Sequence, residues 1–200
     1  MLIQIAETVG ILSFTLSGFY IAVRNNLDIL GIFISSFLTA LGGGIIRDII
    51  LNIPPISLTT MLPTILVVCV VILLILLKFH KKQHFDRKPF FVFIDSIGLA
   101  SFSIAGALLA LQYNFSLSGV VILAFITAIG GGILRDILLN VVPYVLKGGF
   151  YGIISIIIGF TVYSISVFYM INIYSLIIIL VLSIILRWIA FKGNWKLPNL

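Results

Sequence analysis

Seven runs of apolar residues follow one another along the chain, separated by short polar breaks. An α-helix rises about 1.5 Å per residue, so about 20 residues are needed to cross a hydrocarbon core that is ~30 Å thick. Each run has roughly that length, and the breaks between them are rich in Asn, Pro, Gly and charged residues, which favour turns. The pattern predicts an all-α integral membrane protein with seven transmembrane helices. The runs cover residues 3–23, 29–50, 61–79, 91–112, 118–139, 149–170 and 173–191.

Composition agrees with lipid as the solvent of these segments. Hydrophobic residues make up 62% of the 200 residues and charged residues 9%, whereas a soluble domain carries about a quarter charged residues. We expect no separate soluble domain within these 200 residues. Its net charge of +6 is the excess of Lys and Arg that membrane proteins hold in cytoplasmic loops, so we expect no nucleic-acid binding.

The basic residues lie at alternate connections between the runs. The densest group occupies the loop at 80–90 and consists of His80, Lys81, Lys82, His84, Arg87 and Lys88. If this loop is cytoplasmic, the N-terminus lies outside and the C-terminus is cytoplasmic. The outer connections near 51–60, 113–117 and 171–173 then contain no Lys or Arg. The remaining inner basic residues are Arg24, Lys147, Arg187, Lys192 and Lys196.

An internal repeat is the most specific feature of the sequence. GGGIIRDIILNIPP at 42–55 and GGGILRDILLNVVP at 130–143 are identical at ten of fourteen positions, with an offset of 88 residues. The same offset aligns Glu7 with Asp95 and Gly18 with Gly106. Each copy holds three apolar runs, and an odd number makes the second copy enter the membrane from the opposite face. We expect an inverted repeat of 1–88, including the basic cytoplasmic loop, and 89–172, followed by a peripheral seventh helix and tail at 173–200.

The glycine triplets of the repeat fall within the second and fifth runs. Consecutive glycines weaken a helix and remove side chains, so the backbone can bend or another helix can approach closely. One interpretation is a kinked helix that lines or gates a pore, and the other is tight helix packing. Both remain open from the sequence. The residues are Gly42, Gly43, Gly44, Gly130, Gly131 and Gly132.

Charged residues follow both triplets, as Arg47-Asp48 and Arg135-Asp136. Ionisable side chains in spanning segments are costly and face a bundle interior or an aqueous path. Neighbouring residues on a helix do not face each other, so each arginine is expected to need another partner. From their depths in the membrane, Glu7 is predicted to pair with Arg47, and Asp95 with Arg135. Asp48 and Asp136 then remain for a cation path or a helix-end contact. Alternatively, all these charges only hold the helices of the bundle together.

The sequence contains no arrangement of Ser, His and Asp, no HExxH motif and no carboxylate pair suited to catalysis. We therefore expect no enzymatic activity, no catalytic residues, no metal site and no cofactor.

The doubled GGGxxRDxxLN motif in an apolar chain of this size resembles the prokaryotic trimeric intracellular cation (TRIC) channel family, whose members are also described as glycine-transporter-like membrane proteins. The resemblance covers nearly the whole chain. It implies a homotrimer in a prokaryotic plasma membrane and a potassium-preferring pore in each subunit, with the second and fifth helices kinked at the glycines. The implied partners are potassium and, as a second candidate, sodium ions, together with membrane lipid. The Lys-Glu-Val triplet that animal members use for phosphoinositide binding is absent from this sequence.

Three functions are compatible with these features. The leading hypothesis is a passive channel for monovalent cations whose charged pairs hold or gate a constriction. The alternative is a secondary transporter of a small solute such as an amino acid, because inverted repeats with broken helices fit that class equally well. A scaffold without any flux is the third.

Overall fold

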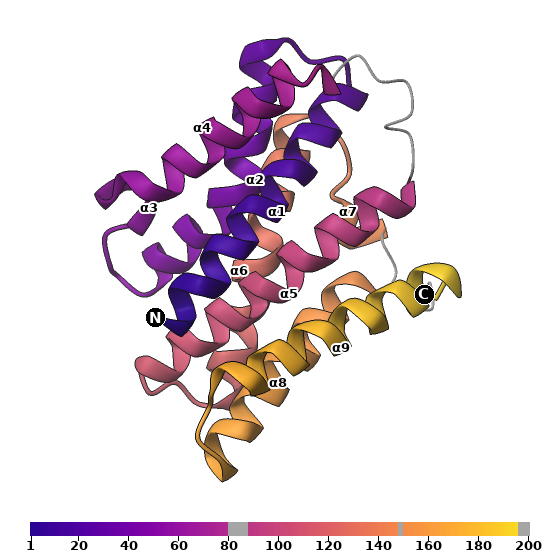
Figure 1. The fold of residues 1–200 in the computed structure, drawn as a ribbon. Helices are drawn as coiled ribbons and strands as arrows, with labels where there is room; N and C mark the ends of the chain where they lie inside the picture. The colour runs from indigo at the N-terminus through magenta and orange to yellow at the C-terminus, as the bar shows by residue number, and fades with distance from the viewer. Residues whose placement is uncertain (80–87, 148–149, 196–200) are drawn as a thin grey trace.

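Helices make up nearly all of the computed structural model, which describes residues 1–79, 88–147 and 150–195 (Figure 1). Most of the basic loop at 80–90 falls outside the described residues. The helices are α1 (Leu2–Arg24), α2 (Ile29–Ile50), α3 (Ile56–Thr59), α4 (Met61–Leu76), α5 (Lys88–Gln112), α6 (Leu117–Leu138), α7 (Tyr144–Lys147), α8 (Tyr151–Phe168) and α9 (Ile173–Lys192).

The seven longer helices coincide with the seven predicted runs to within three residues at each end. Six of them are long and apolar enough to cross a membrane, whereas α4 has 16 residues and is shorter. Seven crossings therefore stay a prediction. Asn172, in the predicted break between the last two runs, starts α9: its side chain accepts a hydrogen bond from the backbone N–H of Ser175, and the Ser175 hydroxyl accepts one from the backbone N–H of Asn172.

The two one-turn helices α3 and α7 were not anticipated from the sequence. Each follows the end of a repeat motif, where Asn52 and Asn140 adopt a left-handed conformation with φ 54°. This conformation ends a helix by directing the next N–H groups back to its last carbonyls. The N–H of Ile53 bonds the Asp48 carbonyl, and the N–H of Val141 bonds the Asp136 carbonyl, each at 3.0 Å. The chain thus turns back over the end of α2 and of α6.

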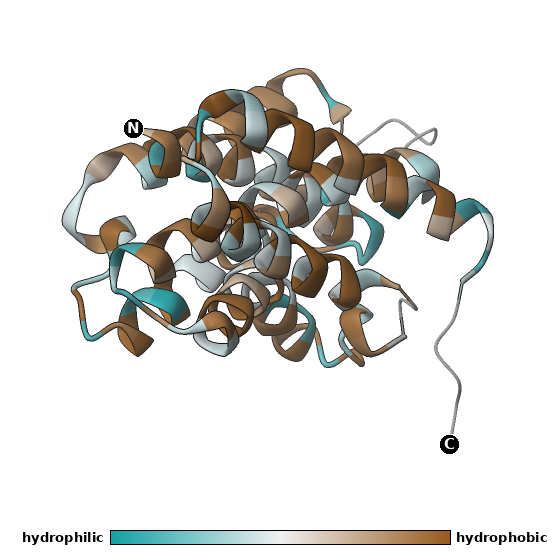
Figure 2. Cartoon of the chain, turned by 90° about the horizontal axis from the view of Figure 1, so that it is seen from below, coloured by the Kyte–Doolittle hydropathy of each residue, from teal (hydrophilic) through white to brown (hydrophobic). Residues whose placement is uncertain are grey.

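The helices of the two sequence repeats make corresponding contacts. Helix α1 packs against α2 as α5 packs against α6, and the two sets meet through α1 against α5 and α2 against α6. Figure 1 shows that α1 and α5 run in opposite directions. Helix α9 packs on α5 and α8 at one side of the bundle. In Figure 2 most residues of the helices are hydrophobic, as expected for helices that cross a membrane.

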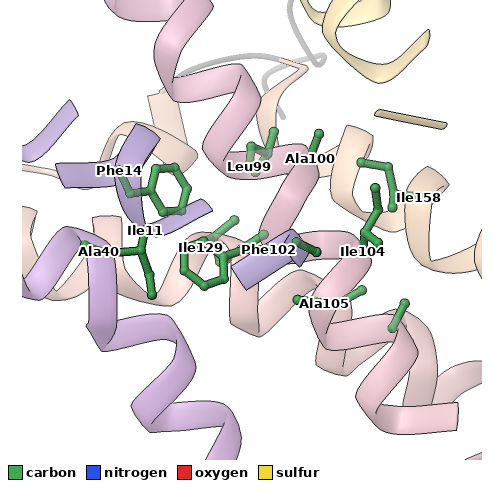
Figure 3. Packing of buried hydrophobic residues seen from close by; sticks show 14 of the residues in the cluster. Ile11, Phe14, Ala40, Leu99, Ala100, Phe102, Ile104, Ala105, Ile129 and Ile158 are labelled. Atoms are coloured by element: carbon green, nitrogen blue, oxygen red, sulfur yellow. The ribbon is translucent and has the colours of Figure 1, made fainter. Parts of the chain in front are cut away.

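The core between the two repeats is hydrophobic and contains a stacked pair of aromatic rings (Figure 3). Phe14 and Phe102, which the offset of 88 relates, have ring centroids 5.3 Å apart and an interplanar angle of 21°. Gly10 and Gly98, equally related, give these rings room. A Cβ on Gly10 would lie 2.8 Å from a Phe102 ring carbon, and one on Gly98 would overlap the Phe14 ring. The centre of the bundle therefore depends on glycine and phenylalanine in the same register in both copies.

Candidate functional site

The glycine triplets bring α2 and α6 into direct backbone contact. A Cβ on Gly42 would lie 3.2 Å from the Gly131 Cα, and one on Gly130 would lie 3.2 Å from the Gly43 Cα. A Cβ on Gly43 would overlap the carbonyl oxygen of Thr127. Both helices run through their glycines without interruption. These contacts favour the interpretation of tight helix packing, and a kink at the glycines stays a prediction.

The third glycine of each triplet has a different environment. A Cβ on Gly44 would meet only the Nη2 atom of Arg47, at 3.9 Å, and one on Gly132 would meet only Nη2 of Arg135, at 3.9 Å. Gly44 and Gly132 therefore face the arginines and leave the space beside each guanidinium group open.

Each arginine pairs with the aspartate that follows it in sequence. Arg47 Nε donates to Asp48 Oδ1 at 2.8 Å, and Arg47 Nη2 lies 2.7 Å from the same oxygen. Arg135 and Asp136 repeat this geometry at the same two distances. The expectation that neighbouring residues cannot pair is wrong here. The rule assumes side chains that extend straight from the helix, whereas the long arginine side chain folds sideways to reach the adjacent carboxylate.

The second oxygen of each aspartate holds the chain that follows the turn. Asp48 Oδ2 accepts a hydrogen bond from the backbone N–H of Ile56 at 2.9 Å, and Asp136 Oδ2 accepts one from Tyr144 N–H at 2.8 Å. These N–H groups belong to the first residues of α3 and α7, where a helix leaves donors unsatisfied. Both aspartates thus make the helix-end contact that was one of their two predicted roles, and at the same time neutralise the arginines.

The predicted ion pair between Glu7 and Arg47 is confirmed. Arg47 Nη1 lies 2.7 Å from Glu7 Oε1, and the Arg47 side chain is 2% exposed. Arg47 is therefore shared between carboxylates from α1 and α2, which satisfies most of its buried charge.

The predicted direct pair between Asp95 and Arg135 is wrong. Asp95 has one methylene fewer than Glu7, and its carboxylate is engaged elsewhere: it accepts a hydrogen bond from Ser17 Oγ at 2.8 Å and another from the Tyr151 hydroxyl. Among the described residues, Arg135 forms an ion pair with Asp136 alone, whereas Arg47 forms ion pairs with both Glu7 and Asp48. The two repeats thus hold equivalent charges but connect them differently.

Two pockets lie beside these charge clusters, at opposite ends of α1. The Glu7 pocket, lined by Glu7, Gly44, Arg47, Asp48 and Phe102 among others, has a volume of about 30 Å³, room for about one water molecule. The Arg135 cavity has a volume of about 470 Å³. Its polar and aromatic lining includes Tyr20, Arg24, Asn25, Phe91, Arg135, Asp136, Tyr144, Arg187, Asn194 and Trp195.

Arg187 was not recognised as a site residue from the sequence, where it counted only as an inner basic residue of a peripheral helix. It is 3% exposed. Its Nη2 donates to the Tyr144 hydroxyl at 3.1 Å, and its guanidinium carbon lies 5.0 Å from the centroid of the Tyr151 ring. The available signal was a single arginine inside the last apolar run, several residues before its end.

Comparison with known proteins shows the family to which the chain belongs. The family model described as Glycine transporter matches residues 4–81 and 92–167. A solved structure from work on conductance through TRIC cation channels has a TM-score of 0.86 and 33% identity, covering 98% of this chain and 96% of that one. The chain belongs to the TRIC family. A prokaryotic TRIC channel crystallised in 0.5 M KCl is similar, with a TM-score of 0.87 and 31% identity over 98% of this chain and 99% of that one.

Membrane proteins of bacteria are similar along the whole chain. The UPF0126 membrane protein YvgT of Bacillus subtilis is 32% identical over 98% of this chain and 95% of its own length. The UPF0126 inner membrane protein YadS of Escherichia coli K12 is 29% identical over 100% and 96%. A TRIC orthologue from Rhodobacter sphaeroides shares the fold, with a TM-score of 0.87 at 24% identity, over 96% of this chain and 98% of that one. This TRIC family chain is a multi-pass membrane protein, and its structural neighbours are cation channels.

Proposed function

We propose that this protein is a passive channel for monovalent cations, with potassium preferred over sodium, and that each subunit contains its own conduction path. The observation that carries the proposal is the placement of the two charged pockets at opposite ends of α1, on either side of the α2–α6 glycine contact. The described similarity to cation channels supports it.

The path runs from the Glu7 pocket, past the glycine contact of α2 and α6, to the Arg135 cavity. Six motif glycines, Arg47, Asp48, Arg135 and Asp136 line or gate it, and Glu7 and Asp95 support the charges. With about 30 Å³ at the Glu7 end and Phe102 stacked on Phe14 beside it, this conformation is closed there. Opening requires Arg47 and Glu7 to move apart, because the pair fills that end of the path.

The membrane arrangement is part of the proposal. Seven helices cross, residues 1–88 and 89–172 form two inverted three-helix halves, and 173–200 adds the seventh helix and a cytoplasmic tail. The N-terminus lies outside, and three copies assemble in the plasma membrane. The absence of Lys and Arg from the outer connections supports the orientation, and the antiparallel α1 and α5 support the inversion (Figure 1).

Potassium efflux from proteoliposomes tests the proposal. Vesicles loaded with potassium and diluted into potassium-free buffer should lose potassium faster than empty vesicles do. This loss should develop a membrane potential and should need no added solute. The double variant Asp48→Asn and Asp136→Asn should change that rate, because it removes the carboxylate charge that pairs with Arg47 from α2 and the one that pairs with Arg135 from α6. Vesicles that contain the protein but leak no faster than empty vesicles would overturn the channel.

A transporter of a small amino acid is the second candidate, because the matching family model is described as Glycine transporter. The same vesicles distinguish the two functions. A carrier should take up radiolabelled glycine with saturation, and unlabelled glycine should compete. A channel should show neither.

A further inference from the structure

The two pockets carry opposite excess charge. The Glu7 pocket is lined by two carboxylates and one guanidinium group, those of Glu7, Asp48 and Arg47. Among the described residues, the Arg135 cavity is lined by three guanidinium groups, those of Arg24, Arg135 and Arg187, and by one carboxylate, that of Asp136. Asp95 is close enough to attract Arg135 and Arg187 but does not line the cavity, and even when it is counted the positive charges remain in excess.

Arg187 causes much of this difference, since it comes from α9, outside the repeat, and has no counterpart at the Glu7 end. Arg135 has Arg47 as its counterpart, and both pair with the next residue. Arg187 has no ion pair among the described residues. It is held by the Tyr144 hydroxyl and by the face of Tyr151, both neutral, and no protein group accepts a hydrogen bond from its Nε within the described chain. Its charge is thus fixed in place and available to the cavity.

We propose that Arg187 makes the pore conduct asymmetrically, by lowering the concentration of cations in the Arg135 cavity. This inference rests on the proposed channel function. A fixed positive charge at one mouth depletes cations there, so cations that enter from the Arg135 cavity carry less current than cations that enter from the Glu7 pocket at an equal and opposite voltage. By Coulomb's law in water, one charge about 8 Å from the ion path changes the local cation concentration about twofold.

Single-channel recording in symmetrical KCl tests this inference. The wild-type protein should show about a 1.5-fold difference in current between the two voltage signs at about 0.1 M KCl, where a Debye length of ~10 Å screens part of the charge, and almost none at about 1 M, where the Debye length is ~3 Å. This salt comparison needs no variant. Antibody access to a tag at the C-terminus, which follows the Arg187 end of α9, assigns the orientation of each channel.

Three variants assign the asymmetry to one residue. Arg187→Gln should make the currents at the two voltage signs nearly equal, by raising the smaller one, and Arg187→Lys should keep the asymmetry. Lys192→Gln is the matched control, because it removes the same charge from the same helix at an exposed position over Trp188, outside the cavity. It should leave the asymmetry unchanged.

The outcomes separate the two proposals. Cation currents that are equal at both voltage signs in 0.1 M KCl would overturn the role of Arg187 and leave the channel intact. The same follows if Lys192→Gln alters the asymmetry as much as Arg187→Gln. Membranes that stay silent with verified incorporation overturn both the channel and this inference.

Discussion

Arg47 Nη1 lies 2.7 Å from the carboxylate of Glu7, whereas at the equivalent position of the second repeat Arg135 makes no direct contact with Asp95. The difference is one methylene in the side chain from α1 or α5. At the first site the pair spans the space between helices and the pocket is about 30 Å³, while at the second a cavity of about 470 Å³ remains. A near-symmetric sequence thus produces a small pocket beside Glu7 and a larger cavity beside Arg135.

Glu7→Gln is expected to destabilise the protein and to loosen the Glu7 end. Removing one partner of a buried ion pair costs about 3–5 kcal/mol. Because Asp48 still neutralises Arg47, we expect the free energy of unfolding to fall by about 2 kcal/mol. The loss should appear as a lower midpoint of thermal unfolding in detergent. Asp28→Asn is the control. It also removes a carboxylate charge but keeps an oxygen that can accept the Gly31 N–H at the start of α2, so it should cost under about 0.5 kcal/mol. Equal midpoints for the two variants would contradict the importance of the pair.

Asp95→Glu is expected to make the second end resemble the first. The added methylene lets the carboxylate reach Arg135, whose Nη1 has no hydrogen-bond acceptor among the described residues. The new pair would narrow the cavity, so the open probability in single-channel recordings should fall. Ser17 and Tyr151 compete for the longer side chain, and Ser17→Ala in the same background should deepen the effect. An open probability equal to that of the wild type in both variants would show that this end does not limit conduction.

Alanine substitutions within one glycine triplet should distinguish a glycine that is closely packed from one that faces open space. Gly43→Ala places a methyl group against the Thr127 carbonyl, and overpacking of this kind costs about 1–3 kcal/mol. Gly44→Ala, the matched control on the same helix, meets only Arg47 Nη2 at 3.9 Å and gains up to about 1 kcal/mol of helix propensity. Thermal unfolding should therefore rank Gly44→Ala at or above the wild type and Gly43→Ala clearly below it. The reverse order would contradict the close α2–α6 contact.

The helices could be predicted from the sequence because lipid requires long apolar runs. The Glu7–Arg47 pair could be predicted because the predicted topology put both residues at one depth in the membrane. The predictions of side-chain partners that were wrong depended on the length and direction of the side chains. The Asp95 carboxylate turns to Ser17 and Tyr151, and Arg47 folds onto its own neighbour. Neither preference appears in residue spacing.

Two further features were missed for different reasons. The one-turn helices α3 and α7 are too short for any hydrophobic period, and they are defined by the aspartate oxygens that accept their first N–H groups. Arg187 was overlooked because α9 has no repeat partner to draw attention to it. An unpaired arginine in an apolar run is nevertheless a signal of function by itself, and it should have been weighed with the motif arginines.

The reversal potential of single-channel currents in asymmetric KCl tests the central claim most directly. Purified protein in a planar bilayer is expected to give discrete current steps that reverse near the potassium equilibrium potential, and the double variant Asp48→Asn and Asp136→Asn should alter their conductance or gating. Reversal near the chloride potential would contradict a cation path, and silent membranes with verified incorporation would favour the transporter.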